Sequence, residues 1–490
     1  MNLPLRRLAI VIFVVFGLLV ASLTYSQEIA GPRYRDDPRN ARVVLDRAGR
    51  ERGGIVTADG VIVAESVADT EDERSFRRSY PFGDLYSHVV GYSSVLFGDR
   101  GLENARGGAL SSDRDATISG LFDALVGEDL RAKGLRLTID HSLQQVASDA
   151  LGDQAGAVVA LDPTTGEILA MVSKPSFDPN TLVSPASSDA GDAIANDPTQ
   201  PLLNRAIEMV YAPGSTFKTV TAAAAVESGG VGPTTEYPNL SELALPGSTA
   251  TIQNFGGGTC GNGEQVTLET AFARSCNTVF GIVGMETGAG DLVGRAEAVG
   301  FNSEIPFDLA TEPSTIPDAD SLVDDLPALA QTALGQRDVR ATPLQMALVA
   351  AAVANDGVVT TPYVVNDVID ADGEVVEATT PTEWRRAFSP STASVLSDMM
   401  ERVVTSGTGQ GAAVPRVRVG GKTGTAEVPG GAPHAWFIGF GPIEAEEGDR
   451  EIAVAVIVES GGSVGETATG GAVAAPIAQK VLSAWLAGRS

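Results

Sequence analysis

Residues 212–218 (APGSTFK) run directly into an Ala-rich segment, residues 219–226. Pro and Gly interrupt the chain just before Ser215, and Ala favours helix, so Ser215 is predicted to lie in the first turn of a helix. Residues three apart share a helical face, which puts the Lys218 amine within hydrogen-bond reach of the Ser215 hydroxyl. The helix dipole and burial both favour the uncharged amine. The segment therefore predicts a nucleophilic serine with a lysine base one turn away.

Lysine is rare in this chain, and its few positions carry information. The five lysines stand among 34 basic residues, and they are Lys133, Lys174, Lys218, Lys422 and Lys480. Arginine cannot give up its proton in a protein, so a lysine in an Arg-rich chain is a candidate for proton transfer. Two further motifs follow the first: Ser275-Cys276-Asn277 and Lys422-Thr423-Gly424. The chain thus contains S-x-x-K, S-x-N and K-T-G in that order, a set known from serine acyltransfer enzymes.

Length and charge limit the classes of protein that need to be considered. A chain of 490 residues can form two or three domains with their own cores. A composition of 43% hydrophobic and 20% charged residues is typical of globular proteins. The net charge of −28 argues against nucleic acid as a partner. Two cysteines and three scattered histidines make a metal site improbable, and no motif calls for a cofactor.

An apolar run near the N-terminus predicts a membrane anchor. Residues 8–23 are apolar apart from Ser22, and Arg6 and Arg7 precede them. Basic residues tend to stay in the cytoplasm, so we expect a cytoplasmic tail (residues 1–7), a single membrane span (8–25) and an extracytoplasmic remainder. A cleaved signal peptide is the alternative, although its apolar core is usually shorter.

Cys260 and Cys276 are the only cysteines. An exported chain permits them to form a disulfide, which would fix one wall of a site containing Ser275 and Asn277. Two unpaired, buried thiols are the alternative, because spacing alone does not show that the two Cβ atoms meet.

The rest of the chain divides near residue 134. Residues 26–134 are polar, with short β-like pieces, and residues 52–64 read as a hairpin around Asp59-Gly60. From residue 135 a strand and a helix lead into two apolar strands, near residues 157–162 and 167–172. Residues 179–200 form a polar loop that could cover the site.

The last region combines helices and strands. Residues 267–287 and 342–354 are predicted to be helical, residues 434–440 and 452–458 to be strands, and residues 472–487 to be the last helix. Strands at both ends of this region predict one antiparallel sheet with helices beside it, an α+β fold.

The three motifs, with the flanking residues 156–162 and 434–439, resemble those of class B penicillin-binding proteins, in particular the actinobacterial penicillin-binding protein A group. The resemblance covers nearly the whole chain. It implies an anchored, mainly β, non-catalytic N-terminal (pedestal or dimerisation-like) module and a transpeptidase domain of the serine β-lactamase-like fold (residues 135–490). The Arg52-Gly53 and Gly101-Leu102-Glu103 segments are similar to segments of that module.

The resemblance implies a serine-type D,D-transpeptidase that cross-links peptidoglycan stem peptides in division or growth and is acylated by β-lactams. In this interpretation Ser215 attacks the penultimate D-Ala carbonyl and Lys218 takes the proton, with Ser215 and Thr425 N–H groups as oxyanion donors. Ser275 relays a proton, Asn277 binds the Lys218 amine and a substrate amide, and Lys422 attracts the terminal carboxylate. Thr423 and Thr425 bind that carboxylate, and Gly424 leaves room for the peptide.

Several alternatives stay open. Ser275 and Asn277 could be helix caps, and residues 420–424 an ordinary turn. The same acylation groups would serve a D,D-carboxypeptidase or a β-lactamase, although no deacylating base is evident. A β-lactam sensor or a divisome scaffold is the non-enzymatic alternative, and a bifunctional class A enzyme would need a longer N-terminal region. The resemblance also implies a multi-spanning glycan polymerase and division proteins as partners.

Overall fold

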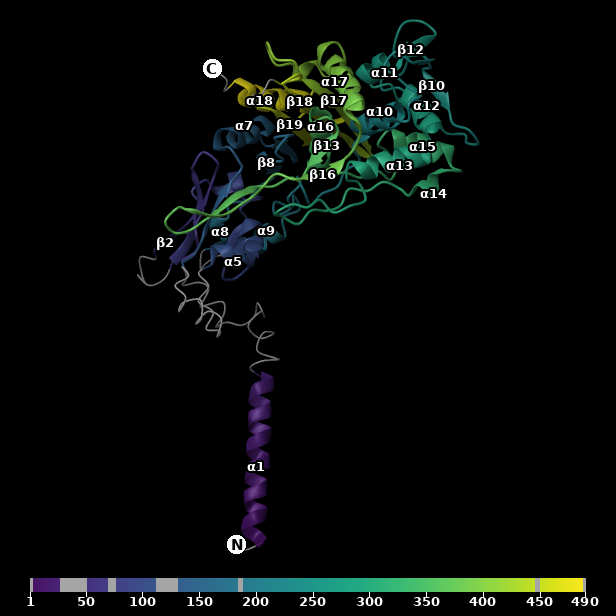
Figure 1. The fold of residues 1–490 in the computed structure, drawn as a ribbon. Coiled ribbons are helices and arrows are strands. Elements are labelled where there is room, and N and C mark those ends of the chain that lie inside the picture. Colours follow the sequence, from purple (N-terminus) through teal and green to yellow (C-terminus); the bar gives the residue numbers. More distant parts are fainter. Residues whose placement is uncertain are drawn as a thin grey trace.

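The structure of the chain is a computed structural model, and Figure 1 shows it as a ribbon. It describes residues 3–26, 51–68, 76–111, 131–183, 188–445 and 450–487. Parts of the expected tail (residues 1–2) and module (27–50, 69–75 and 112–130) lie outside the described residues. The Asp59-Gly60 turn is confirmed, because β1 (Ile55–Val56) and β2 (Ile62–Ala68) pair antiparallel around it.

The first helix, α1 (Leu3–Thr24), has the dimensions of a membrane span. Its 22 residues correspond to about 33 Å at the usual helical rise, close to the thickness of a bilayer core. Residues 6–24 satisfy the length and composition of a span, and none of that stretch is buried against the rest of the protein. Figure 1 shows this helix standing apart from the folded body. The helix begins at Leu3, so part of the expected tail is helical.

A six-stranded sheet forms the core of the N-terminal module, and it takes strands from beyond residue 134. Strand β6 (Gly134–Leu137) pairs parallel with β1 and antiparallel with β14 (Val365–Ile369). The strand order is β15-β14-β6-β1-β2-β3, where β3 is Phe76–Ser79 and β15 is Val375–Ala378. The module is therefore completed by a hairpin that lies more than two hundred residues later in the chain.

A five-stranded antiparallel sheet forms the core of the larger region, in the order β17-β18-β19-β7-β8. The strands are β7 (Gly156–Leu161), β8 (Ile168–Lys174), β17 (Gly420–Val428), β18 (Gly431–Gly441) and β19 (Ile452–Val458). Every residue of β7 and β19 is buried, as expected for strands covered on both faces. The predicted α+β architecture, with one sheet completed by the two ends of this region, is confirmed.

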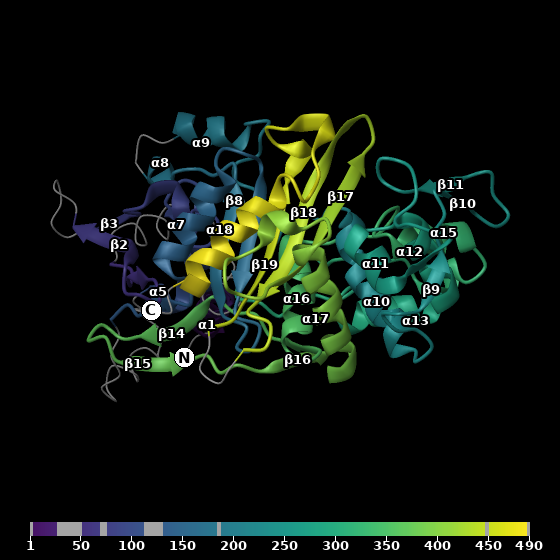
Figure 2. The same ribbon diagram turned by 90° about the horizontal axis from the view of Figure 1, so that it is seen from above.

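Helices cover both faces of this sheet, as Figure 2 shows. On one face lies α16 (Pro343–Ala354), which is capped by Thr342 and is buried over almost its whole length. On the other face α18 (Ala474–Ala487) packs with α7 (His141–Leu151). A strand with both faces covered can be apolar throughout, which explains the uninterrupted Val and Ile of β19.

A mainly helical lobe flanks β17 and supplies the other walls of the site. It contains α10 (Lys218–Glu227), α11 (Leu268–Arg274), α12 (Asn277–Thr287) and α15 (Leu326–Ala333). The helical stretch predicted over residues 267–287 is two helices, because the chain turns sharply at Ser275.

The expectation that residues 179–200 cover the site is wrong. This segment contains α8 (Asn180–Val183) and α9 (Ser188–Ala195), and α8 packs against the N-terminal module. Ser94 donates a hydrogen bond of 2.6 Å to the carbonyl of Leu182, and Asn180 binds the backbone of Tyr80. The Asn180 side chain and the Leu182 carbonyl make this interdomain contact, so low hydrophobicity did not indicate a cover over the site.

Candidate active site

Ser215 lies in a single 3₁₀ turn, Gly214–Phe217, that leads directly into α10. Gly214 has a φ of 52°, and a Cβ at this position would come within 2.8 Å of the Thr425 carbonyl oxygen. Glycine is therefore required for the turn to lie against β17. The Trp436 side chain of β18 donates a hydrogen bond of 3.1 Å to the Ala212 carbonyl and so holds the chain just before this turn against the sheet.

The second motif sits at the break between two helices. Ser275 ends α11 with φ 62° and ψ 41°, a left-handed conformation that is uncommon for residues other than glycine. Cys276 is the N-cap of α12, and Asn277 is the first residue of that helix. Strained backbone of this kind is often kept where it positions a functional group. Here it places the Ser275 hydroxyl, the Ser275 carbonyl and the Asn277 amide around one point.

Lys218 is buried at that point, with no part of it exposed. Its Nζ donates to the Asn277 Oδ1 and to the Ser275 carbonyl, both at 2.7 Å, and lies 3.4 Å from Ser275 Oγ. Burial, together with the charge of Lys422, holds the pKa of Lys218 well below its usual range. The predicted convergence of Lys218 with Ser275 and Asn277 is thus present, and the amine is in an environment that favours its neutral form.

The predicted contact between Lys218 and Ser215 differs from the one observed. Among the hydrogen bonds of the described residues, none joins Lys218 Nζ to Ser215 Oγ. The Lys218 amine instead donates to Ser275 and Asn277 of the second motif, although Lys218 follows Ser215 by only three residues. Catalytic hydrogen bonds are often formed only when substrate is bound, so this geometry leaves Lys218 available as a base.

Lys422 reaches the same cluster from β17. It is fully buried, and its Nζ donates to Ser275 Oγ and to the Thr423 carbonyl, both at 2.9 Å. Burial lowers the pKa of Lys422 to about 7. Ser275 Oγ therefore lies between two lysine amines, and no carboxylate among the described residues forms an ion pair with either amine.

The two residues that follow Lys422 shape the edge of the sheet. Thr423 exchanges a hydrogen bond of 2.5 Å with the Thr408 hydroxyl. A Cβ at Gly424 would meet the Pro213 carbonyl and the Thr216 methyl at 2.9 Å, so only glycine fits between β17 and the Ser215 turn. Ser215, Thr423 and Thr425 all line one open cavity of about 1430 Å³, together with Ser275 and Asn277.

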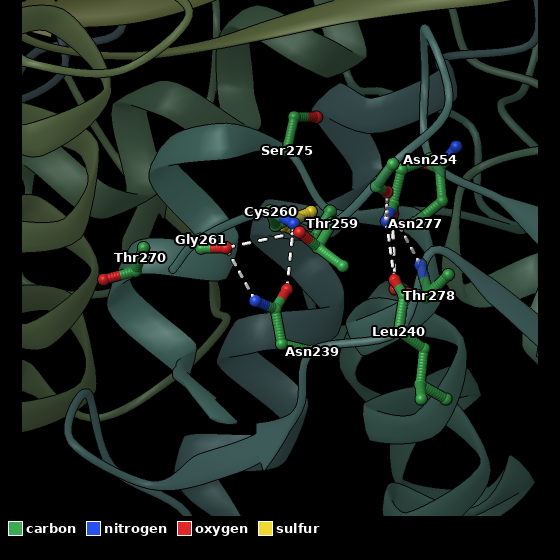
Figure 3. Close-up of a disulfide and its surroundings, with 12 residues drawn as sticks. Asn239, Leu240, Asn254, Thr259, Cys260, Gly261, Thr270, Ser275, Asn277 and Thr278 are labelled. Atoms are coloured by element: carbon green, nitrogen blue, oxygen red, sulfur yellow. Dashed lines mark hydrogen bonds between the residues drawn. A yellow bond between two sulfur atoms is a disulfide. The ribbon is translucent and has the colours of Figure 1, made fainter. Parts of the chain in front are cut away.

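The disulfide left open by the sequence is formed in the structure, between Cys260 and Cys276. Asn239 fixes its loop by accepting from the Cys260 N–H and donating to the Gly261 carbonyl. Figure 3 shows these contacts around the sulfur atoms, next to Ser275 and Asn277. The Asn277 side chain also donates to the Gln253 carbonyl at 2.9 Å. The loop of residues 253–262 is thereby attached to the second motif and forms one wall of the cavity.

Comparison with known proteins shows which family this chain belongs to. Residues 156–483 match the family profile described as the penicillin-binding protein transpeptidase domain, and residues 52–134 match the penicillin-binding protein A dimerisation domain. The chain belongs to the penicillin-binding protein family. The resemblance predicted from the three motifs is confirmed.

Two curated relatives and one solved structure illustrate the similarity. The peptidoglycan D,D-transpeptidase PbpA of Mycolicibacterium smegmatis is 43% identical over 99% of both chains. The protein of the same name from Mycobacterium tuberculosis is 40% identical over the full length of both. The ceftriaxone acyl-enzyme complex of penicillin-binding protein A from M. tuberculosis superposes with a TM-score of 0.82. It is 39% identical and covers 90% of this chain and 100% of that one.

Sequence reasoning missed several residues of this penicillin-binding protein's cavity. Thr408 and the segment 469–472 line it beside Thr423, and residues 253–262, a Gly-rich stretch without a catalytic motif, form another wall. A Cβ at Gly470 would lie 2.5 Å from the Gly424 carbonyl oxygen, so the Gly470-Gly471 pair marks a close approach. The Gly470-Gly471 pair was the one feature of the sequence that could have pointed to this part of the cavity. The residues around Thr408 look like those of an ordinary turn.

Proposed function

We propose that this protein is a peptidoglycan D,D-transpeptidase that works through an acyl-enzyme on Ser215. The observation that supports it most strongly is the pair of buried amines, Lys218 and Lys422, that share the Ser275 hydroxyl beside Ser215. Burying two lysines without a carboxylate is costly for stability, and a fold that only needed packing would place apolar residues there. The cost is understandable if the amines exchange protons during a reaction.

In the acylation step, Ser215 Oγ attacks the carbonyl of the penultimate D-Ala while neutral Lys218 accepts the hydroxyl proton. The N–H groups of Ser215 and Thr425 stabilise the oxyanion as the carbonyl becomes tetrahedral. The C–N bond then breaks, and Ser275 passes a proton to the departing D-Ala amine from the lysine pair. An amine of a neighbouring stem attacks the resulting ester, which restores the Ser215 hydroxyl and forms the cross-link.

The other site residues bind the substrate. Asn277 orients Lys218 and offers its amide to the donor peptide, and Lys422 supplies positive potential for the terminal carboxylate. Thr423 and Thr425 donate hydrogen bonds to that carboxylate. Gly424 lets the donor backbone lie against the edge of β17. A β-lactam would acylate Ser215 in the place of the donor, in line with the acyl-enzyme complex known for the M. tuberculosis relative.

The length and composition of the first helix support a membrane-anchored enzyme. We propose that α1 anchors the chain in the plasma membrane, with Arg6 and Arg7 on the cytoplasmic side and the catalytic domain outside. The domain division at residue 134, with a non-catalytic module before it, accords with the two family matches. A multi-spanning glycan polymerase and division proteins are the partners that such an anchored synthase would need.

Intact-mass measurement after incubation with penicillin G tests the proposal. The wild-type chain should gain the mass of one intact penicillin molecule, and Ser215→Ala should gain none. A stable adduct on the Ser215→Ala variant would remove Ser215 from its role, and rapid loss of the wild-type adduct would identify a β-lactamase. Cross-linking of a donor and acceptor stem, rather than simple release of D-Ala, distinguishes a transpeptidase from a carboxypeptidase.

A further inference from the structure

The charges that line the cavity differ along the length of β17. The only basic residue on the described cavity wall is Arg274, which precedes Ser275 in the chain. Lys422 is buried beneath this part of the wall, where its amine contacts the Ser275 hydroxyl. The acidic residues of the wall are Glu427 and Glu466. Glu427 follows Lys422 by five residues, about 16 Å along an extended strand. The cavity is therefore basic where a terminal carboxylate would bind and acidic farther along the same strand.

Glu427 lies on the cavity wall at the end of the regular part of β17. Thr423, Thr425 and Glu427 are two residues apart and all line the cavity, whereas Ala426 between them is fully buried. The pairing with β18 becomes irregular after Ala426, and Glu427 stays exposed. Glu427 thus follows Thr425 by two residues, about 6.6 Å of extended strand, and both it and Val428 line the cavity where the regular pairing of β17 ends.

The Glu427 carboxylate is available to a ligand. It takes part in none of the ion pairs or side-chain hydrogen bonds found among the described residues, although the chain contains many Arg–Glu pairs. An unneutralised carboxylate on the wall of a cleft raises the local concentration of cations, and Glu466 adds to the same potential. The complementary ligand group is therefore a free amine.

The proposed reaction places one part of the donor beside this carboxylate. The donor lies antiparallel to β17, with its terminal carboxylate near Thr423 and the carbonyl that is attacked at the N–H of Thr425. The residue that precedes the penultimate D-Ala then lies next to residues 426–427. We infer that Glu427 recognises a side-chain ammonium on that preceding donor residue, so the enzyme selects donors with a free amine at this position. This inference rests on the proposed function and adds a specificity residue to it.

Thioester donors test the inference with the full chain in detergent. Two peptides are compared: each has D-Ala joined to thioglycolate in place of the last residue, and the residue before D-Ala carries either a free or an acetylated side-chain amine. Attack by Ser215 forms the ester and releases the thiol, whose appearance gives kcat/KM. Wild type should prefer the free amine by about 3–10-fold at low ionic strength, and salt should reduce this preference.

Glu427→Gln should abolish that preference and should not slow acylation by penicillin G, since penicillin has no such amine and itself carries a negative charge. Glu377→Gln removes the same charge from β15, far from the cavity, and should keep the full preference. The inference is overturned if Glu427→Gln still prefers the free amine, or if the preference disappears in Glu466→Gln instead. Failure of wild type to react with either thioester or with penicillin would overturn the proposed function itself, which is a distinct outcome.

Discussion

Two regions of the molecule bury charged side chains, and they neutralise them in different ways. In the N-terminal module Glu103 is fully buried between Arg52 and Arg78, at 2.8 and 2.5 Å, and Asp99 lies 3.6 Å from Arg52. In the catalytic site Lys218 and Lys422 are equally buried but are surrounded by hydroxyl, amide and carbonyl oxygens.

The difference separates a structural role from a chemical one. Arginines paired with carboxylates remain ionised, so the module cluster holds three segments of chain together and takes no part in proton exchange. Lysines without a carboxylate partner lose much of the stabilisation of their charged form, so their protons become easy to remove. Burial alone therefore does not single out a catalytic group, whereas two buried lysines without a counter-ion beside a serine hydroxyl mark candidates for proton transfer.

The largest effect is expected on the rate of acylation, when the lysine base is replaced by an arginine that stays charged. Lys218→Arg should slow acylation by penicillin G by about 10²–10⁴-fold, because a guanidinium cannot accept the Ser215 proton. The rate is measured as the growth of the acyl-enzyme mass with time. Lys480→Arg, on the exposed side of α18, serves as the control and should leave the rate unchanged. An unchanged rate in Lys218→Arg would show that Lys218 is not the base.

The next largest effect is expected from the buried cluster of Glu103 with Arg52 and Arg78 in the N-terminal module. Glu103→Gln leaves two buried guanidinium groups without their shared carboxylate and should lower the free energy of unfolding by about 3–5 kcal/mol. Urea unfolding of the full chain measures it, with Glu377→Gln as a charge-matched control. Acylation of the remaining folded protein should be nearly normal. A loss below about 1 kcal/mol would show that the module does not depend on this pairing.

A third effect, smaller for each pH unit, distinguishes the lysine site from the arginine cluster by the pH dependence of stability. The pKa of Lys422 is about 7 in the folded protein and about 10.4 for an unperturbed lysine. Between these values the unfolded chain binds more protons, so stability should rise with pH by up to about 1.4 kcal/mol per pH unit.

Comparison of wild type with Lys422→Met between pH 7 and 10 measures this contribution together with the effect of the lost Lys422 charge on Lys218, because the variant lacks the titrating amine. Wild type should gain stability relative to the variant as the pH rises. Parallel curves would mean that the amine keeps its ordinary pKa in the folded state. The arginines of the module cluster do not titrate in this range and contribute no such slope.

The smallest effect is expected from an exposed ion pair, which shows how little such a pair adds to stability compared with the buried groups of the two regions. Arg100 and Glu208 form a half-exposed ion pair of 2.9 Å between the module and the catalytic region. Arg100→Gln should change the free energy of unfolding by less than about 1 kcal/mol, because solvent screens the pair. Thermal or urea unfolding measures the change. A loss of unfolding free energy as large as that of Glu103→Gln would mean that the contribution of an ion pair to stability does not depend on its exposure to solvent.

Local features of the fold were predictable because their determinants are near one another in sequence. The apolar runs around the turn at residues 163–166 specified the β7–β8 hairpin, and Thr342-Pro343 specified the start of α16. Gly214 next to Ser215 indicated the sharp turn that carries the nucleophile. Capping, turn formation and hydrophobic alternation act over a few residues, so a single sequence is enough to locate them.

The sequence by itself determined the three motifs, their order and the chemistry of each side chain. Only the tertiary structure decided that Lys422 meets Ser275 across 147 residues, that Cys260 bonds Cys276, and that Thr408 pairs with Thr423. It also decided that a late hairpin completes the N-terminal sheet and that residues 253–262, not 179–200, form a wall of the cavity. The physical reason is that such contacts, and the burial that lowers a lysine pKa, depend on how distant segments pack, which no local pattern encodes.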